Sequence, residues 1–312
     1  MNTLELGWGN TYFLYPFWKN LPPMTHALDK DLSYAIVLPE LIQAIRMLHY
    51  KEQNVFGPHA TDHEIVIANG ATQVIQAAIS ALGAKHVYAS PPYFMRFPDM
   101  ANMAGANFVR NYENADVEIA TCPNNPDGEW LQRLGSKIPT IYDYCYNWQQ
   151  YFRTGDAMKT DKDLMVFSLS KATGHASTRL GWALVKDPEV AAKMRKFIEY
   201  QTCGVSIEAQ NKAYQVLIHH WVSDVNVMEL GRAVMNYRWK ILGDLGFQVR
   251  DGIFLWEKRA EYFAKAGVTG IGGEAFGSTN EWIRLNMGCT DDDFSEFVTR
   301  VRNFSLTETI VK

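Results

Sequence analysis

The sequence predicts an α/β fold, in which a large domain with a mostly parallel sheet flanked by helices is followed by a smaller α+β domain. In the first part of the 312 residues, apolar strand-like runs alternate with short helical patterns. Such alternation is typical of a parallel sheet covered on both faces. After about residue 206 the pattern changes to long helices, then to two strands and a closing helix. The chain is long enough for two domains, because single hydrophobic cores stop growing near this length.

We expect the chain to divide into three segments. Residues 1–33 are rich in Trp, Tyr, Phe and Pro without a sustained period. They form an N-terminal arm that either joins the small domain or covers the site. Residues 34–205 form the large domain, which carries the candidate site, and residues 206–312 hold a linking helix and the small domain.

The elements of the large domain follow from periodicity and turn residues. A helix is predicted at 39–50, where Pro39 suits the first turn and apolar residues recur at positions 41, 42, 45 and 48. A strand at 64–70 then ends in a glycine turn that opens a helix at 71–82. The next predicted elements are a strand at 86–93, a helix at 97–105, strands at 107–112, 116–128 and 138–148, and two strands within 164–187.

The remaining elements belong to the linking region and the small domain. They are helices at 188–200 and 206–240, strands within 247–258 and 281–288, and a closing helix at 291–304. Because ligands bind beyond the carboxyl ends of strands in parallel sheets, the site is expected at that edge of the large sheet.

Composition excludes several classes of function. Hydrophobic residues make up 47% and charged residues 21%, as in ordinary globular proteins, and a net charge of −4 without a basic run argues against a nucleic-acid partner. No apolar run is long enough for a membrane span and the N-terminus lacks the pattern of a signal peptide, so we expect a cytoplasmic protein with no membrane partner. The four cysteines are widely spaced without C-x-x-C, and Pro58 argues against a helical His59–His63 pair, so no metal site is expected.

The most informative stretch is 164–187. It is predicted to be a strand ending in Ser168-Leu-Ser170-Lys171, a polar loop that contains Arg179, and a second strand. This pattern is typical of a lysine that forms a Schiff base, with serine hydroxyls and a guanidinium binding a phosphate nearby. The alternative is a lysine on a solvated loop, and the stretch alone does not decide between the two.

Two further motifs lie where predicted strands end. Gly70-Ala71-Thr72 stands at the start of a helix, whose free N–H groups can bind a phosphate. The alternative is a tight turn that needs Gly70 for its backbone freedom. Asn125 lies in the turn 123–128 and can donate to a phenolate oxygen, although turn formation alone explains most such sequences.

Charged and aromatic residues complete the set of candidates. Asp143 ends an apolar run and needs a cation or a donor, such as a protonated pyridine nitrogen, unless it caps a helix. Tyr146 can point its hydroxyl at the same ring or be a core tyrosine. Tyr93 can stack on that ring, although a core position is the more common one for such a residue. Arg284, within an apolar strand, suits either a substrate carboxylate or a structural ion pair.

The order of these motifs along the chain resembles that of the fold-type I pyridoxal-phosphate enzymes of the aspartate aminotransferase superfamily. The stretches CPNNPDG and SLSKATGHASTRLGWALVKD are similar to the alliinase and tryptophan–pyruvate aminotransferase branch. The resemblance covers about residues 34–290. The motifs that carry it are Gly70-Ala71-Thr72-Gln73, Tyr93, Asn125-Pro126-Asp127-Gly128, Asp143 with Tyr146, Ser168-Leu-Ser-Lys171, Arg179 and Arg284.

The resemblance implies pyridoxal 5'-phosphate as cofactor and assigns roles to these residues. Lys171 would form the Schiff base and move the substrate Cα proton, Asp143 would pair with the pyridine nitrogen, and Arg284 would bind the substrate carboxylate. The remaining implied roles are the 3' oxygen for Asn125 and Tyr146, ring stacking for Tyr93, the phosphate for Ser168, Ser170, Arg179 and the Gly70-Ala71-Thr72 turn, and the partner subunit's phosphate for Tyr34.

The resemblance further implies an aminotransferase that acts on an L-amino acid and a 2-oxo acid, as a homodimer with a shared active site. The aromatic arm suggests a large or aromatic substrate, or simply a packed core. The first alternative is a carbon–sulfur lyase, which is less attractive because the Cys-rich N-terminal module of plant alliinases is absent. The second is a cofactor-binding module without catalysis. The chain is short for the family in the parts that select substrates, so the sequence assigns no particular substrate.

Overall fold

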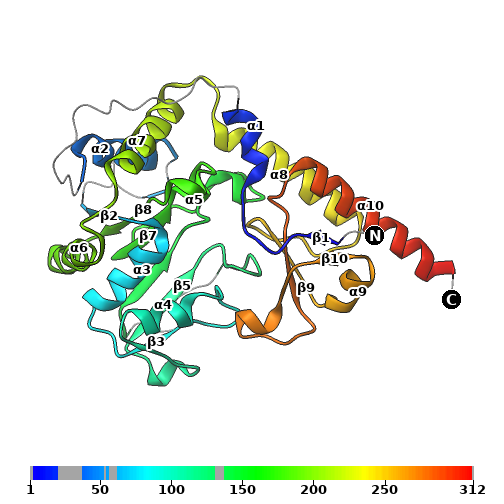
Figure 1. The fold of residues 1–312 in the computed structure, drawn as a ribbon, viewed down its shortest axis with the longest axis horizontal. Helices are drawn as coiled ribbons and strands as arrows, with labels where there is room; N and C mark the ends of the chain where they lie inside the picture. The colour runs from blue at the N-terminus through cyan, green and yellow to red at the C-terminus, as the bar shows by residue number, and fades with distance from the viewer. Residues whose placement is uncertain (1–2, 20–36, 53, 56–61, 131–136, 311–312) are drawn as a thin grey trace.

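The computed structural model of the protein describes residues 3–19, 37–52, 54–55, 62–130 and 137–310, with residues 305–310 by backbone alone. Within these residues the largest sheet has seven strands in the order β2-β8-β7-β6-β5-β3-β4 (Figure 1). β8 is antiparallel to both of its neighbours, and the other neighbouring strands are parallel. The predicted α/β class is confirmed. The strands are β2 (Glu64–Ala68), β3 (His86–Tyr88), β4 (Asn107–Phe108), β5 (Val117–Thr121), β6 (Thr140–Asp143), β7 (Leu164–Ser168) and β8 (Gly181–Val185).

Helices cover both faces of this large sheet (Figure 1). Successive residues of a strand face opposite sides, so that Met165 and Phe167 of β7 pack into one apolar core while Leu164 and Val166 pack into another. The first core is covered by α2 (Pro39–Glu52) and α7 (Ile207–Val222). The second is covered by α3 (Gly70–Ala81), α4 (Phe97–Met103) and α6 (Pro188–Thr202).

A smaller α+β unit follows the long helix α8 (Val227–Asp244). Its antiparallel sheet has the strand order β11-β12-β9, and helices α9 (Ala260–Lys265) and α10 (Asp291–Ile310) accompany it. These strands are β9 (Phe254–Glu257), β11 (Ile271–Gly272) and β12 (Ile283–Asn286). The N-terminal β1 (Leu4–Glu5) pairs with β10 (Val268–Thr269), which joins the start of the chain to the small unit.

Short helical turns connect these elements. Those that bear on the site are η1 (Tyr12–Leu14), α1 (Tyr15–Trp18), η4 (Gln149–Tyr151), α5 (Leu169–Ala172), η5 (Ala176–Thr178) and η6 (Gly273–Phe276). The strand expected at 107–112 is shorter than predicted, because the chain leaves β4 and forms the turn η3 (Tyr112–Asn114). The strand expected within 247–258 begins only at Phe254, after a turn at Gly252.

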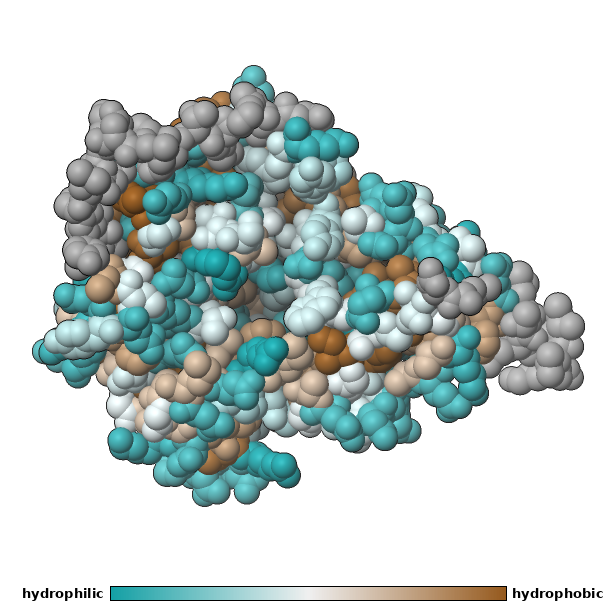
Figure 2. All heavy atoms as spheres, in the orientation of Figure 1, coloured by the Kyte–Doolittle hydropathy of each residue, from teal (hydrophilic) through white to brown (hydrophobic). Residues whose placement is uncertain are grey.

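No helix among the described residues combines the length with the apolar character needed to cross a bilayer. The face drawn in Figure 2 is mainly hydrophilic, with hydrophobic residues in small separate groups. Nor do the histidines, cysteines and acidic residues in the described part of the chain form a group of three or more that could hold a metal ion.

The antiparallel direction of β8 brings its first residue against the start of α3. A Cβ atom on Gly181 would lie 2.4 Å from the Ala71 backbone nitrogen and 2.5 Å from the Gly70 carbonyl carbon. Because backbone atoms cannot move aside as side chains do, only glycine permits this approach. The first turn of α3 is thereby fixed beside the ends of β7 and β8.

We predict that Gly181→Ala lowers the free energy of unfolding by about 1–3 kcal/mol, because the added methyl group overpacks against backbone. Urea denaturation followed by circular dichroism measures this change. Gly243→Ala in α8 is the matched control, since its Cβ would meet nothing within 4 Å and alanine favours a helix over glycine by about 1 kcal/mol. Equal effects of the two substitutions would contradict the prediction.

Candidate active site

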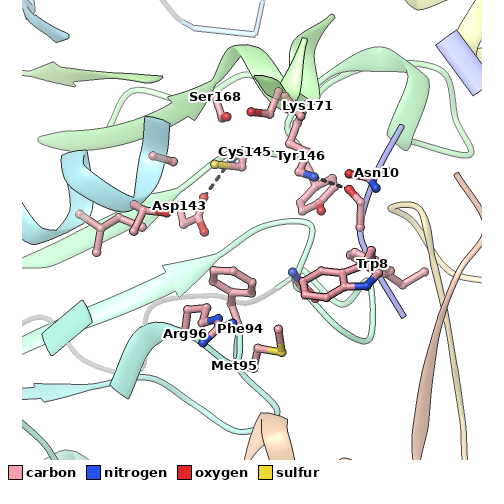
Figure 3. Close-up of a pocket in the computed structure, with 18 of the residues that line it drawn as sticks. Trp8, Asn10, Phe94, Met95, Arg96, Asp143, Cys145, Tyr146, Ser168 and Lys171 are labelled. Atoms are coloured by element: carbon pink, nitrogen blue, oxygen red, sulfur yellow. Dashed lines mark hydrogen bonds between the residues drawn. The ribbon is translucent and has the colours of Figure 1, made fainter. Parts of the chain in front are cut away.

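A cavity of about 310 Å³ opens at the carboxyl edge of the large sheet, between this sheet, the small unit and the N-terminal arm (Figure 3). Most of the residues predicted from the sequence line it. These are Ala71, Thr72, Asn125, Asp143, Tyr146, Ser168, Ser170, Lys171, Arg179 and Arg284. The predicted Tyr34 lies outside the described residues.

Lys171 lies on the one-turn helix α5, which begins directly where β7 ends. Its Nζ donates a hydrogen bond of 2.5 Å to the Gly9 carbonyl oxygen and lies 5.5 Å from the centre of the Tyr146 ring. Burial lowers the pKa of Lys171 to about 8, and the positive charges of Arg284 and Arg179 act in the same direction. An amine with this pKa is partly neutral near neutral pH, as a nucleophile or a base must be.

Asp143 ends β6 on the opposite side of the cavity from the arm (Figure 3). It is only 5% exposed, and its Oδ1 accepts a hydrogen bond of 3.1 Å from the Cys145 backbone nitrogen. Burial raises the pKa of this carboxyl group. A cation beside it, such as a protonated ring nitrogen, would reverse the shift and keep the carboxylate ionised.

Arg179, the start of α3 and two serines form a cradle for an anion. Arg179 has φ 53° in the left-handed region, and its Nη1 donates to the Ala176 carbonyl oxygen at 2.9 Å. A Cβ atom at position 70 would lie 2.5 Å from Arg179 Nη2. Glycine at this position therefore leaves room for the Arg179 guanidinium group over the first turn of α3. The hydroxyl-bearing Ser168 and Ser170 line the same cavity. Free helix N–H groups, hydroxyls and a guanidinium are the donors that suit a phosphate.

Arg284 reaches the cavity from β12 and is only 3% exposed. Its Nη1 donates to Asn125 Oδ1 at 2.7 Å and its Nη2 donates to the Gly7 carbonyl oxygen at 2.9 Å. The guanidinium lies 4.2 Å from the centre of the Phe254 ring and 4.8 Å from that of Phe276. Within the described part of the chain no carboxylate forms a salt bridge with it. A buried cation without an acidic partner suits an anionic ligand.

Tyr93, which was expected to stack on a ring, is not among the residues that line this cavity. Its ring packs 4.9 Å from that of Phe108, and Gly277 lies against its edge. The next residue, Phe94, lines the cavity instead (Figure 3). The role of Tyr93 in ring stacking therefore stays a prediction from the sequence, and Phe94 is the aromatic residue of this loop that lines the cavity.

Several residues that line the cavity were not predicted from the sequence. Phe94, Met95, Arg96 and Cys145 are among them (Figure 3). In the N-terminal arm, Trp8 borders the cavity, while Phe13 of η1 is buried in the core. The arm has no hydrophobic period from which these two parts could have been separated.

We predict that, in the protein without bound ligand, acylation of Lys171 follows an apparent pKa of about 8 rather than the ordinary 10.5. The rate rises with pH until the amine is neutral and is constant above that range, since only the neutral amine reacts. Acetic anhydride labelling with peptide mass spectrometry measures it, with exposed Lys258 in the same digest as reference.

Asp143→Asn is expected to lower this apparent pKa further, because the Asp143 carboxylate stabilises the charged lysine. Identical profiles for Lys171 and Lys258 would refute the assignment of a buried, partly neutral amine.

Comparison with known proteins identifies a family and several relatives that are similar to this chain. The chain matches the family described as Allinase over residues 8–249. It is 29% identical to "Tryptophan aminotransferase-related protein 3" of Arabidopsis thaliana, over 97% of this chain and 79% of that protein. It is 32% identical to "Alliin lyase" of Allium cepa var. aggregatum, over 57% of this chain and 43% of that protein.

Solved structures with the same architecture include two aminotransferases. The structure of the aromatic aminotransferase from Pyrococcus horikoshii OT3 aligns with a TM-score of 0.75 at 20% identity, over 99% of this chain and 97% of that one. A double mutant of the Thermus thermophilus aspartate aminotransferase aligns with a TM-score of 0.75 at 16% identity, over 97% of this chain and 92% of that one. At these identities the comparison shows a shared fold.

Proposed function

The chain belongs to the family described as Allinase, and we propose that it is an aminotransferase that moves the amino group of an L-amino acid to a 2-oxo acid. The family and its fold confirm the resemblance found in the sequence, to fold-type I enzymes that depend on pyridoxal 5'-phosphate. The cofactor is therefore established at the level of the family. The particular reaction is our proposal.

The residues around the cavity fit this cofactor. The cradle of Ser168, Ser170, Arg179 and the start of α3 provides donors for its phosphate, and the buried Asp143 provides an anion for its ring nitrogen. When bound, the cofactor supplies an electron-accepting ring that stabilises negative charge at the substrate Cα. Asp143 would favour this by keeping the ring nitrogen protonated.

The other side chains would handle the substrate. Lys171 would hold the cofactor through its Nζ and, once released, accept the proton from the substrate Cα as a general base. Its pKa of about 8 suits this task, because the neutral amine is available near neutral pH. Arg284 would bind the substrate carboxylate, with Asn125 orienting its guanidinium through the 2.7 Å hydrogen bond.

The observation that carries the proposal is the convergence of Lys171, Asp143 and Arg284, from three elements far apart in the sequence, on one cavity. This set also argues against a module that binds the cofactor without catalysis. Transfer is favoured over elimination because the similarity to the tryptophan aminotransferase-related proteins 3 and 4 of Arabidopsis extends over 97% and 94% of this chain. The similarity to the alliin lyases covers 57–67% of the chain and supports a carbon–sulfur lyase as the second candidate.

We predict that an L-amino acid alone converts the bound cofactor to its amino form once, releasing 2-oxo acid in an amount equal to the sites. A transferase needs a second substrate to turn over, so adding a 2-oxo acid restores the original absorbance. Spectrophotometry and 2-oxo acid assay measure both steps. Repeated turnover of a cysteine sulfoxide to pyruvate and ammonia would instead identify a lyase.

Lys171→Ala is the control for the lysine. It is expected to lose the half-reaction and the covalent fixation of cofactor by borohydride. If the variant still fixed the cofactor, another residue would form the link.

The walls of the cavity support a large or aromatic amino acid as donor. Trp8 and Phe94 line it together with Met95, opposite the side from which Lys171 enters (Figure 3). Trp8 is 66% exposed, so a substrate side chain packed on its indole ring would remove a large apolar surface from water. We also propose that the enzyme is a homodimer, as the sequence resemblance implies, and that it is cytoplasmic.

We predict that Trp8→Ala raises KM for aromatic amino acids roughly 2- to 10-fold, the range expected for one aromatic contact, and changes KM for alanine much less. Steady-state kinetics with both substrates measures the difference. Tyr15→Ala is the matched control, because Tyr15 is 64% exposed on the same arm but does not line the cavity. Equal effects of Trp8→Ala on both amino acids would remove Trp8 from substrate recognition.

A further inference from the structure

Side chains from distant parts of the chain hold the turn that carries Lys171. α5 spans only Leu169–Ala172, so its C-terminal carbonyl groups have no partner within the helix. Each carbonyl oxygen from residue 170 to residue 173 accepts a hydrogen bond from such a side chain. The pairs are Thr11 Oγ1 to Ser170 at 3.4 Å, Tyr151 Oη to Lys171 at 2.7 Å, Gln150 Nε2 to Lys171 at 3.3 Å and to Ala172 at 3.0 Å, and Trp18 Nε1 to Thr173 at 2.9 Å.

The shortest of these bonds joins Tyr151 to the lysine itself. Tyr151 is fully buried, and burial raises the pKa of its hydroxyl far above the ordinary value, so the group remains a donor. Its ring lies edge-on to that of Tyr146, with the ring centres 5.3 Å apart. Tyr151 therefore contacts both the backbone of Lys171 and a wall of the cavity, although it does not line the cavity itself.

Tyr151 also joins this turn to the small unit. Its backbone carbonyl oxygen accepts a hydrogen bond of 2.7 Å from the Gly252 backbone nitrogen, just before β9. β9 carries Phe254, which packs on the Arg284 guanidinium. One residue thus connects the backbone of Lys171 with the part of the chain that holds Arg284.

We propose that Tyr151, assisted by Gln150, is a positioning residue for Lys171. It fixes the carbonyl end of α5, and through this the direction in which the lysine side chain enters the cavity. The proposal rests on the role of Lys171 in the proposed function. Tyr151 acts through the lysine backbone and does not touch the reacting atoms.

Tyr151→Phe tests this proposal directly. It keeps the buried ring and removes only the hydroxyl, so the Lys171 carbonyl retains only the longer bond from Gln150. A loosened turn lets Nζ leave its buried position. We expect kcat to fall roughly 10- to 100-fold, as for a displacement of about 1 Å at a reacting group, with KM for the amino acid nearly unchanged.

Two spectroscopic and chemical readouts separate positioning from general stability. In the holoprotein, the pH titration of the cofactor absorbance should shift its midpoint, because this band reports the protonation of the link to Lys171. In the protein without cofactor, the apparent pKa for acylation of Lys171 should rise from about 8 towards 10.5, since the amine is less buried. The second readout is independent of the transferase reaction.

Tyr144→Phe is the matched control. Tyr144 is another buried tyrosine near the end of β6, but its hydroxyl bonds to Thr160 Oγ1 at 3.0 Å and not to α5. This variant should leave both titrations and kcat unchanged. Gln150→Met, which removes the amide donor and keeps Tyr151, should produce smaller shifts in the same direction and serves if Tyr151→Phe does not fold.

The proposal would be overturned if Tyr151→Phe and Gln150→Met both gave the same cofactor and acylation titrations as the wild-type protein. It would also be overturned if Tyr144→Phe shifted these titrations as much as Tyr151→Phe does. Failure of the proposed function has a different signature. In that case borohydride would not fix the cofactor on Lys171 of the unaltered protein, while the acylation profile would still decide whether Tyr151 positions the lysine.

Discussion

Burial of two cations and one carboxylate around a single cavity is the constraint on which the rest of the structure depends. Arg284 and Asp143 are 3% and 5% exposed, and the pKa of Lys171 is lowered to about 8, chiefly by burial. Charges in such surroundings cost free energy unless dipoles or partners face them. The protein meets part of this need with backbone carbonyl groups of the arm, since Gly7 accepts from Arg284 and Gly9 accepts from Lys171. In the proposed function, the substrate carboxylate would supply the complementary charge for Arg284 and the cofactor ring nitrogen that for Asp143.

The parts of this site that produce a recognisable local pattern could be predicted from the sequence. Asp143 ends an apolar strand, Lys171 closely follows another and Arg284 interrupts a third, so each charged residue stands out from its neighbours. The α/β class could be predicted in the same way, because each strand and helix shows its own hydrophobic periodicity in the sequence. Phe94 was missed because two aromatic residues are adjacent, and only the backbone direction decides which of them faces the cavity.

Contacts between segments far apart in the chain could not be predicted, because no local sequence pattern indicates them. Pairing of Leu4 with Val268 joins the N-terminal arm to the small unit through strands too short to have a period. The bond from Tyr151 to the Lys171 carbonyl depends on where η4 lies once α8 and the small unit are in place. Both are properties of the packed protein, and neither can be read from the residues nearby.

The reversed direction of β8 has a consequence for how this protein can vary. Because β7 and β8 are antiparallel neighbours, a single short connection between them places Lys171 near one end and Arg179 near the other, at the same edge of the sheet. Surface loops generally tolerate insertions. Here the loop length sets the separation between the amine and the anion-binding guanidinium, so an added or deleted residue would alter the fit to a ligand of fixed size. Variation in length is therefore expected to be confined to loops at the opposite edge of the sheet and in the small unit.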